Sequence, residues 1–272
     1  MKGYLKETFN KEIVVPKDTT FTTESTFYGL KINNGGVARH GGHRKVCRAW
    51  MAHIFKLLQY AYHRVGWKAF NIILRVLPKD RQHSNEALAL EGRDLFSKIL
   101  EQVKKDVKSY EGFYRIHLER DEINNGGYHY HGALVARGLQ STSAIEIAFK
   151  KVQEKYTKYS NASLVFSAPD IRLVKNEVDK EYFKVLGITA NGSRKFLELN
   201  SDVAFEYMAY VYSYHAKLYT KESLIRNKIT IASGNRMKPW SKGIHRNADF
   251  QQPAVMAFCR TVELNAGAQL IH

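Results

Sequence analysis

The sequence predicts an α+β fold: a mainly antiparallel sheet with helices on one face, plus an N-terminal helical and ribbon extension. Two patterns predict it. Neighbouring segments on either side of the turn-rich INNGG alternate between apolar and polar residues, which is typical of a β-hairpin. Several longer segments repeat apolar residues at steps of three and four, which is typical of amphipathic helices. The order strand, helix, two strands, helix, strand, helix favours an antiparallel sheet covered by helices.

The N-terminal part is predicted to extend the main domain. Residues 1–45 mix short β-like runs with glycines and have no long apolar period, so we expect an arm or a small ribbon there. From Val46 to Val65 the apolar residues recur at helical spacing, and Gly66 follows as a helix stop. The predicted regions are an arm and helix over 1–65, a main domain over 66–240 and a C-terminal tail over 241–272.

The main domain is predicted to alternate strands and helices. FNIILRVL is a β-branched run that ends at Pro78, and Asn200 or Ser201 caps the last helix. The predicted strands span 70–77, 112–121 and 128–136, followed by ASLVFS, DIRLV and KITIAS. The predicted helices span 84–107, 142–159 and 202–218.

Composition and charge narrow the class of protein. The 272 residues are 44% hydrophobic and 12% aromatic, which excludes disorder along most of the chain. The formal charge of +16 favours a phosphate polymer or an anionic lipid as partner. Because no apolar run approaches about 18 residues and MKGYLKETFNKE lacks a signal-peptide core, we expect a cytoplasmic protein that binds nucleic acid and no membrane. Cys47 and Cys259 lack the CxxC spacing of a zinc ribbon, so we expect both to be reduced.

Two histidines in YHYHGALV form a candidate metal site. His129 and His131 are two residues apart, so the period of a strand puts both imidazoles on one face. Tyr130 then points to the opposite face with Leu134, where we expect burial under helices. An HxH pair by itself is also typical of a polar strand surface.

The preceding strand offers the third ligand. Its polar face is formed by Arg115, His117, Glu119 and Asp121. Since polar faces of antiparallel neighbours lie together, we expect Glu119 close to the histidines. A tight Asn125-Gly126 turn would instead offer Glu122, but would bring Ile116 and Leu118 beside the histidines. Two imidazoles and one carboxylate suit Mg²⁺ or Mn²⁺, because positions stay open for phosphate oxygens.

A tyrosine-rich helix is the second candidate element. In FEYMAYVYSYHAKLYTK, one helical stripe carries Tyr207, Tyr210, Tyr214, Lys217 and Lys221. A phenol and an ammonium therefore project together. Without other motifs, such a stripe is equally typical of packing and of solvated lysines.

Together the two motifs resemble the HUH endonucleases that initiate rolling-circle replication. His129-Tyr130-His131 matches histidine, bulky hydrophobic residue, histidine, and Tyr214 to Lys217 matches YxxK on a helix. YHYHGALV and SYHAKLYTK are similar in particular to the replication initiators of filamentous phages and bacterial prophages. The resemblance covers about 66–240.

The resemblance implies a ferredoxin/RRM-like fold and an activity. Single-stranded or supercoiled origin DNA would be nicked and rejoined through a 5′-phosphotyrosine on Tyr214, with Lys217 stabilising the phenolate. Tyr210 is either a second nucleophile, as in two-tyrosine initiators, or a packing residue. No helicase motif follows, so the resemblance implies recruitment of a helicase in a bacterial host cell.

Basic clusters support a nucleic-acid partner. Between 217 and 246 there are eight Lys or Arg and a single acid, Glu222. The residues expected to bind DNA there are Lys221, Arg226, Lys228, Arg236, Lys238 and Trp240. Two functions outside the initiator class stay open: a non-catalytic DNA-binding regulator, and a relaxase or transposase with the same chemistry.

Overall fold

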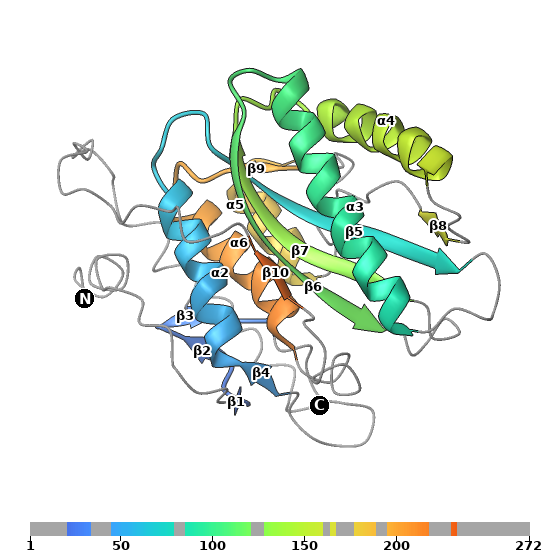
Figure 1. Ribbon diagram of the computed structural model, residues 1–272. Helices are drawn as coiled ribbons and strands as arrows, with labels where there is room; N and C mark the ends of the chain where they lie inside the picture. The colour runs from blue at the N-terminus through green and yellow to red at the C-terminus, as the bar shows by residue number, and fades with distance from the viewer. Residues whose placement is uncertain are drawn as a thin grey trace.

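A six-stranded antiparallel sheet forms the centre of the protein (Figure 1). The computed structural model describes residues 21–33, 45–78, 85–120, 128–159, 164–166, 177–188, 195–217 and 230–232. The strand order is β10, β6, β7, β5, β8, and β9 also pairs with β5. These strands are β5 (Lys68–Pro78), β6 (Glu111–Arg120), β7 (Tyr128–Arg137), β8 (Leu164–Phe166), β9 (Leu197–Glu198) and β10 (Thr230–Ala232).

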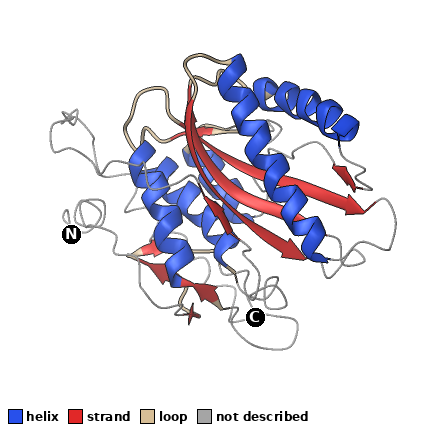
Figure 2. Ribbon diagram, viewed as in Figure 1, coloured by secondary structure: helices blue, strands red, loops and turns tan. Residues whose placement is uncertain are grey.

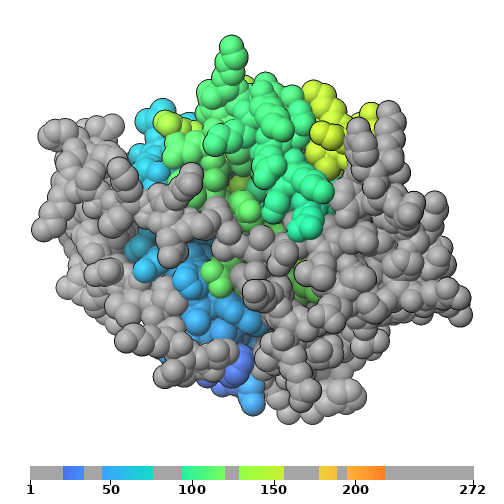
Figure 3. Space-filling view, viewed as in Figure 1, coloured from blue at the N-terminus to red at the C-terminus, as the bar shows by residue number. Residues whose placement is uncertain are grey.

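Helices cover both faces of this sheet (Figure 2). On one face, α3 (Asn85–Asp106) and α4 (Ser143–Tyr159) pack on the even-numbered residues of the central strands, such as Ile72, Leu118 and Leu134. On the other face, α2 (Arg48–Ala61), α5 (Glu177–Val185) and α6 (Asp202–Ser213) form a second core that includes Phe113 and Val135. In the space-filling view of Figure 3, atoms of the α2 region and of the α3 region are visible on the same side of the molecule.

The expected α+β class with an antiparallel sheet is confirmed, but the prediction of helices on one face is wrong. The odd-numbered face carries apolar Phe113 and Val135 at one end and polar Glu119 and His131 at the other. Because all four of these residues are buried, the polar end is an interior site rather than a solvated surface. The expected burial of Tyr130 is confirmed.

The N-terminal helix is part of the core. The buried residues of α2 include Met51, Ile54, Phe55 and Leu58, and they belong to the same cluster as α6. Short strands precede it: β1 (Phe21–Thr22) pairs with β4 (Val46–Cys47), and β2 (Thr26–Phe27) pairs with β3 (Leu30–Lys31). Cys47 is buried and forms no disulfide within the part of the chain that the structure describes, and Cys259 lies outside that part.

The β6–β7 hairpin pairs odd-numbered residues with odd-numbered residues. Glu119 lies opposite His129, and His117 lies opposite His131. This is the register that the polar faces predicted, and it excludes the even-to-odd pairing of a tight Asn125-Gly126 turn. Glu122 and the DIRLV segment lie outside the described residues.

Two helices and one strand match the predicted segments, and two short elements were not predicted. The helices predicted at 84–107 and 142–159 agree closely with α3 and α4, and KITIAS contains β10. The helix α5 and the two-residue strand β9 were not predicted, because each is too short to show a clear period. None of the described helices has the length and apolar character that a membrane span requires.

His53 on α2 makes the stability of the fold depend on pH. Burial, together with the nearby positive charges of Arg115 and Lys56, lowers its pKa to about 4. Because the fold favours the neutral imidazole, the unfolded chain takes up the proton first as pH falls. We expect the free energy of unfolding to fall between pH 6.5 and pH 4, as measured by urea denaturation.

The matched variant is His53→Gln, which keeps a polar side chain without a titratable ring. Its stability should fall less steeply over the same pH range. Equal slopes for the two proteins would contradict the role assigned to His53.

Candidate active site

Three predicted metal ligands come together at one end of the β6–β7 hairpin. Oε2 of Glu119 lies 3.6 Å from Nε2 of His129 and 3.8 Å from Nδ1 of His131. Their ligand atoms all lie within 4.8 Å of one another, which makes them the group of described residues able to hold a metal ion. The odd-to-odd register is the cause, since it puts all three side chains on one face.

Burial prepares these side chains for a cation. The Glu119 side chain has no exposed surface, whereas His129 is partly exposed. Burial lowers the pKa of His131 to about 4, although the Glu119 carboxylate acts in the opposite direction. Its imidazole is therefore neutral at pH 7, the form that coordinates metals.

His131 also provides a test of whether the residues fit an ion. Neither of its ring nitrogens has a hydrogen-bond partner among the described residues, although both are buried. A buried polar atom without a partner costs free energy, and coordination would offset that cost. With one carboxylate oxygen and two imidazoles, the donor set fits a divalent ion such as Mn²⁺ or Mg²⁺.

Tyr214 and Lys217 follow the end of α6. The α-helix ends at Ser213 rather than near Leu218, and Tyr214–Ala216 form a 3₁₀ turn, η1. The prediction that Tyr214 and Lys217 lie on one α-helical stripe is therefore wrong in detail. Because residues three apart are stacked in a 3₁₀ turn, the two side chains still meet: Nζ of Lys217 lies 3.3 Å from the centre of the Tyr214 ring.

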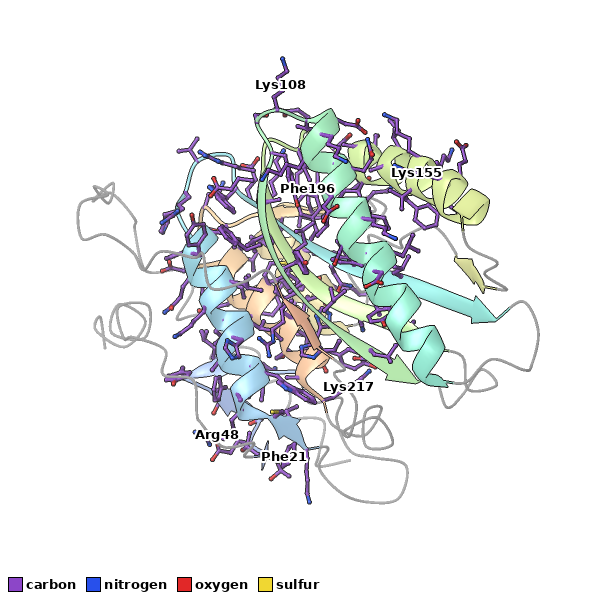
Figure 4. All side chains as sticks on the ribbon, in the orientation of Figure 1. Phe21, Arg48, Lys108, Lys155, Phe196 and Lys217 are labelled. Carbon is purple, nitrogen blue, oxygen red and sulfur yellow. The ribbon has the colours of Figure 1, made fainter. Side chains whose placement is uncertain are left out.

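The backbone of Lys217 is fixed as well as its side chain. Its N–H donates to the Tyr214 carbonyl at 3.3 Å, and the residue forms a β-bridge with Val46 just before α2. Figure 4 labels Lys217 where the chain leaves α6. The N-terminal segment thus holds the end of the tyrosine helix in place.

The three candidate metal ligands, called the metal group (Glu119, His129 and His131), contact the tyrosine motif (Tyr214 to Lys217) at the Glu119 carboxylate. Nζ of Lys217 lies 3.2 Å from Oε2 of Glu119, and both side chains are almost fully buried. The ring of Tyr214 lies edge-to-face with that of His131, 5.8 Å between centroids. Two motifs far apart in the sequence are therefore one cluster in space.

Two further residues support this cluster and were missed from the sequence. His215 packs on His131 with ring centroids 4.1 Å apart, and its Nε2 lies 2.8 Å from Oδ1 of Asn71. Both His215 and Asn71 are buried. The available signal was a polar Asn inside the apolar run FNIILRVL.

The other tyrosines of α6 pack against the sheet and α5. The Tyr212 hydroxyl is shared between the carbonyls of Phe70 and Leu134, at 2.7 and 3.0 Å, and burial raises its pKa well above the ordinary value. Tyr207 is fully buried, and Tyr210 has a ring contact with Tyr182 of α5 at 6.4 Å. Of the two tyrosines predicted to be nucleophiles, Tyr214 is thus the one in ring contact with His131.

The residues predicted to bind DNA follow Lys217 in the sequence. Lys221, Arg226, Lys228, Arg236, Lys238 and Trp240 all lie outside the described residues, so their role stays a prediction. On α4, Lys150 and Lys155 are exposed, while Lys151 forms an ion pair with Asp106 at 3.0 Å.

Removing one ligand should abolish tight binding of a divalent ion. We expect Glu119→Gln and His131→Ala to weaken Mn²⁺ binding by at least about tenfold, because each removes one of three protein ligands. Isothermal titration calorimetry on protein without DNA measures this. Glu198→Gln is the matched control, an exposed glutamate on the same sheet. Wild-type affinity in Glu119→Gln would show that the carboxylate is structural.

No family model, curated protein or solved structure matches the chain. What indicates a function is the chemistry of the candidate site, together with the motifs that contain its residues: Glu119, His129, His131, Tyr214 and Lys217.

Proposed function

We propose that the protein is a metal-dependent enzyme that nicks and rejoins origin DNA through a covalent tyrosine intermediate, as in rolling-circle replication initiators. One observation carries the proposal: the HxH strand and the YxxK turn converge on the buried carboxylate of Glu119. A set of two imidazoles, a carboxylate, a phenol and an ammonium in contact is what phosphodiester transfer to tyrosine requires.

Each group has a chemical task in that reaction. A divalent ion held by Glu119, His129 and His131 would supply a Lewis acid for the scissile phosphate. A tyrosine phenol has an ordinary pKa near 10 and is a weak nucleophile until its negative charge is stabilised. The ammonium of Lys217 over the Tyr214 ring provides that stabilisation, because the charge of a phenolate spreads into the ring.

The transfer of the DNA strand to Tyr214 needs no reactant besides the DNA and the tyrosine. The Tyr214 oxygen forms a bond to phosphorus while the bond from phosphorus to the 3′ oxygen breaks. The phenolic proton leaves to solvent, and the 3′ oxygen takes up a proton as it departs. The products are a 5′-phosphotyrosine and a free 3′-hydroxyl, and the reverse attack rejoins the strand without ATP.

The substrate class follows from charge. A formal charge of +16 favours binding to a phosphate backbone, and we propose single-stranded or supercoiled origin DNA of a phage-like or prophage element as substrate, unwound by a host helicase. A regulator that only binds DNA would share the positive charge. It would have no use for a buried ammonium, carboxylate and imidazole in contact with a tyrosine, a costly arrangement that favours catalysis.

The covalent adduct identifies the nucleophile. Incubation with single-stranded origin DNA and Mn²⁺ should give a protein band shifted by the attached 5′ strand on a denaturing gel. Tyr214→Phe should abolish this band, because the variant loses only the attacking oxygen. Tyr210→Phe is the matched control on the same helix and should still form the adduct.

Two outcomes would contradict this assignment. One is an adduct that persists in Tyr214→Phe, and the other is a peptide map that locates the DNA on Tyr210. Absence of any adduct with wild-type protein, despite DNA binding, would favour the non-catalytic regulator.

Lys217 should affect the rate of nicking more than DNA binding. We expect Lys217→Ala to slow adduct formation by about 10²–10⁴, the range for a positioned acid–base or charge partner. The rate is measured under single-turnover conditions, with DNA affinity measured in parallel by fluorescence anisotropy. An unchanged rate would leave Lys217 a structural role alone.

A further inference from the structure

Lys217 and the histidines face the same oxygen of Glu119. Oε2 lies 3.2 Å from Nζ of Lys217, 3.6 Å from Nε2 of His129 and 3.8 Å from Nδ1 of His131. The Lys217 side chain is 4% exposed and that of Glu119 has no exposed surface. The ammonium is therefore a buried counter-charge to the carboxylate that the proposed ion would use.

A buried carboxylate needs one compensating cation, and two cations at one oxygen repel each other. With little water between them to screen the charges, an ammonium and a divalent ion a few ångströms apart are strongly unfavourable. From this geometry we infer that Lys217 and the divalent ion compete for Glu119, an inference that rests on the proposed function.

The competition links the metal group to the nucleophile. With the Glu119 carboxylate engaged by an ion, the ammonium would still contact the face of the Tyr214 ring, which lies 3.3 Å from Nζ. The β-bridge to Val46 and the 3₁₀ turn hold the Lys217 backbone, so the side chain changes partner without leaving the site. The Lys217 ammonium would then be available to stabilise the Tyr214 phenolate when the metal ligands are occupied. By linkage, Lys217 weakens metal affinity to the same extent that the ion weakens its pairing with Glu119.

The test measures metal binding in the absence of DNA. Mn²⁺ is titrated by calorimetry into wild-type protein and into Lys217→Met, whose side chain has similar length and no charge. We expect the variant to bind Mn²⁺ on the order of tenfold more tightly, because the competing cation is gone. Weakened nicking in the same variant would show that tighter metal binding alone does not activate Tyr214.

Lys68 provides a matched control in the same sheet. It is also a buried lysine over an aromatic ring: Nζ lies 4.4 Å from the Phe196 ring centre and donates to the Leu139 carbonyl at 3.0 Å. Lys68→Met removes a buried charge outside the metal group, so its Mn²⁺ affinity should equal that of wild type. An equal gain in both variants would reduce the effect to general charge and overturn the inference.

Other outcomes separate this inference from the proposed function. Equal or weaker Mn²⁺ binding by a folded Lys217→Met, with wild-type binding intact, overturns the competition and leaves the proposed metal site. Absence of Mn²⁺ binding in both proteins overturns the metal site itself.

A second measurement follows the wild-type protein during the titration and uses a variant only to assign the resonance. The ¹⁵N resonance of the Lys217 ammonium, assigned by its loss in Lys217→Arg, is followed during titration with Mg²⁺. We expect it to move as the site saturates. A resonance that stays unchanged to saturation overturns the inference.

Discussion

The carboxylate of Glu119, which has no exposed surface, constrains the elements packed around it. Glu119 lies between the sheet and the helices on its odd-numbered face, where a charge is tolerated only with a counter-charge in contact. Lys217 meets that need, and the imidazoles of His129 and His131 lie near the same oxygen. The fold at this end of the sheet is therefore organised around one charge rather than around apolar packing.

The register of β6 and β7 and the end of α6 are both consistent with this constraint. A slip of one residue between β6 and β7 would turn Glu119 toward the apolar core of α3 and α4. Ending α6 in a 3₁₀ turn directs Lys217 back toward the sheet, where the bridge to Val46 fixes it. His215 packs on His131, and Asn71 in turn contacts the other side chain of this pair, that of His215.

Much of this arrangement could be predicted from local patterns, and the remainder depended on tertiary contacts. Alternation along β6 and β7 was enough to bring Glu119 to His129, because polar faces pair with polar faces. The same alternation suggested a solvated face, since a buried polar site and a surface have the same sequence pattern. Nothing in YSYHAK is a helix stop, as it contains no Gly or Pro, so the end of α6 at Ser213 could not be predicted. The supporting role of Asn71 could not be predicted, because its partner His215 is distant in the sequence and approaches it only in the folded chain.

The bridge between Val46 and Lys217 also bears on how such a protein is inherited. Both motifs lie beyond residue 66, so the sequence alone suggests that this part of the chain could be exchanged as one segment. Their geometry, however, depends on a backbone partner and a core helix encoded before that point. Recombination that joined this part to a foreign N-terminal segment would transfer every residue of the candidate site and lose the strand that forms the bridge with Lys217. Exchange between lineages should therefore preserve the two parts together, as a single evolutionary module.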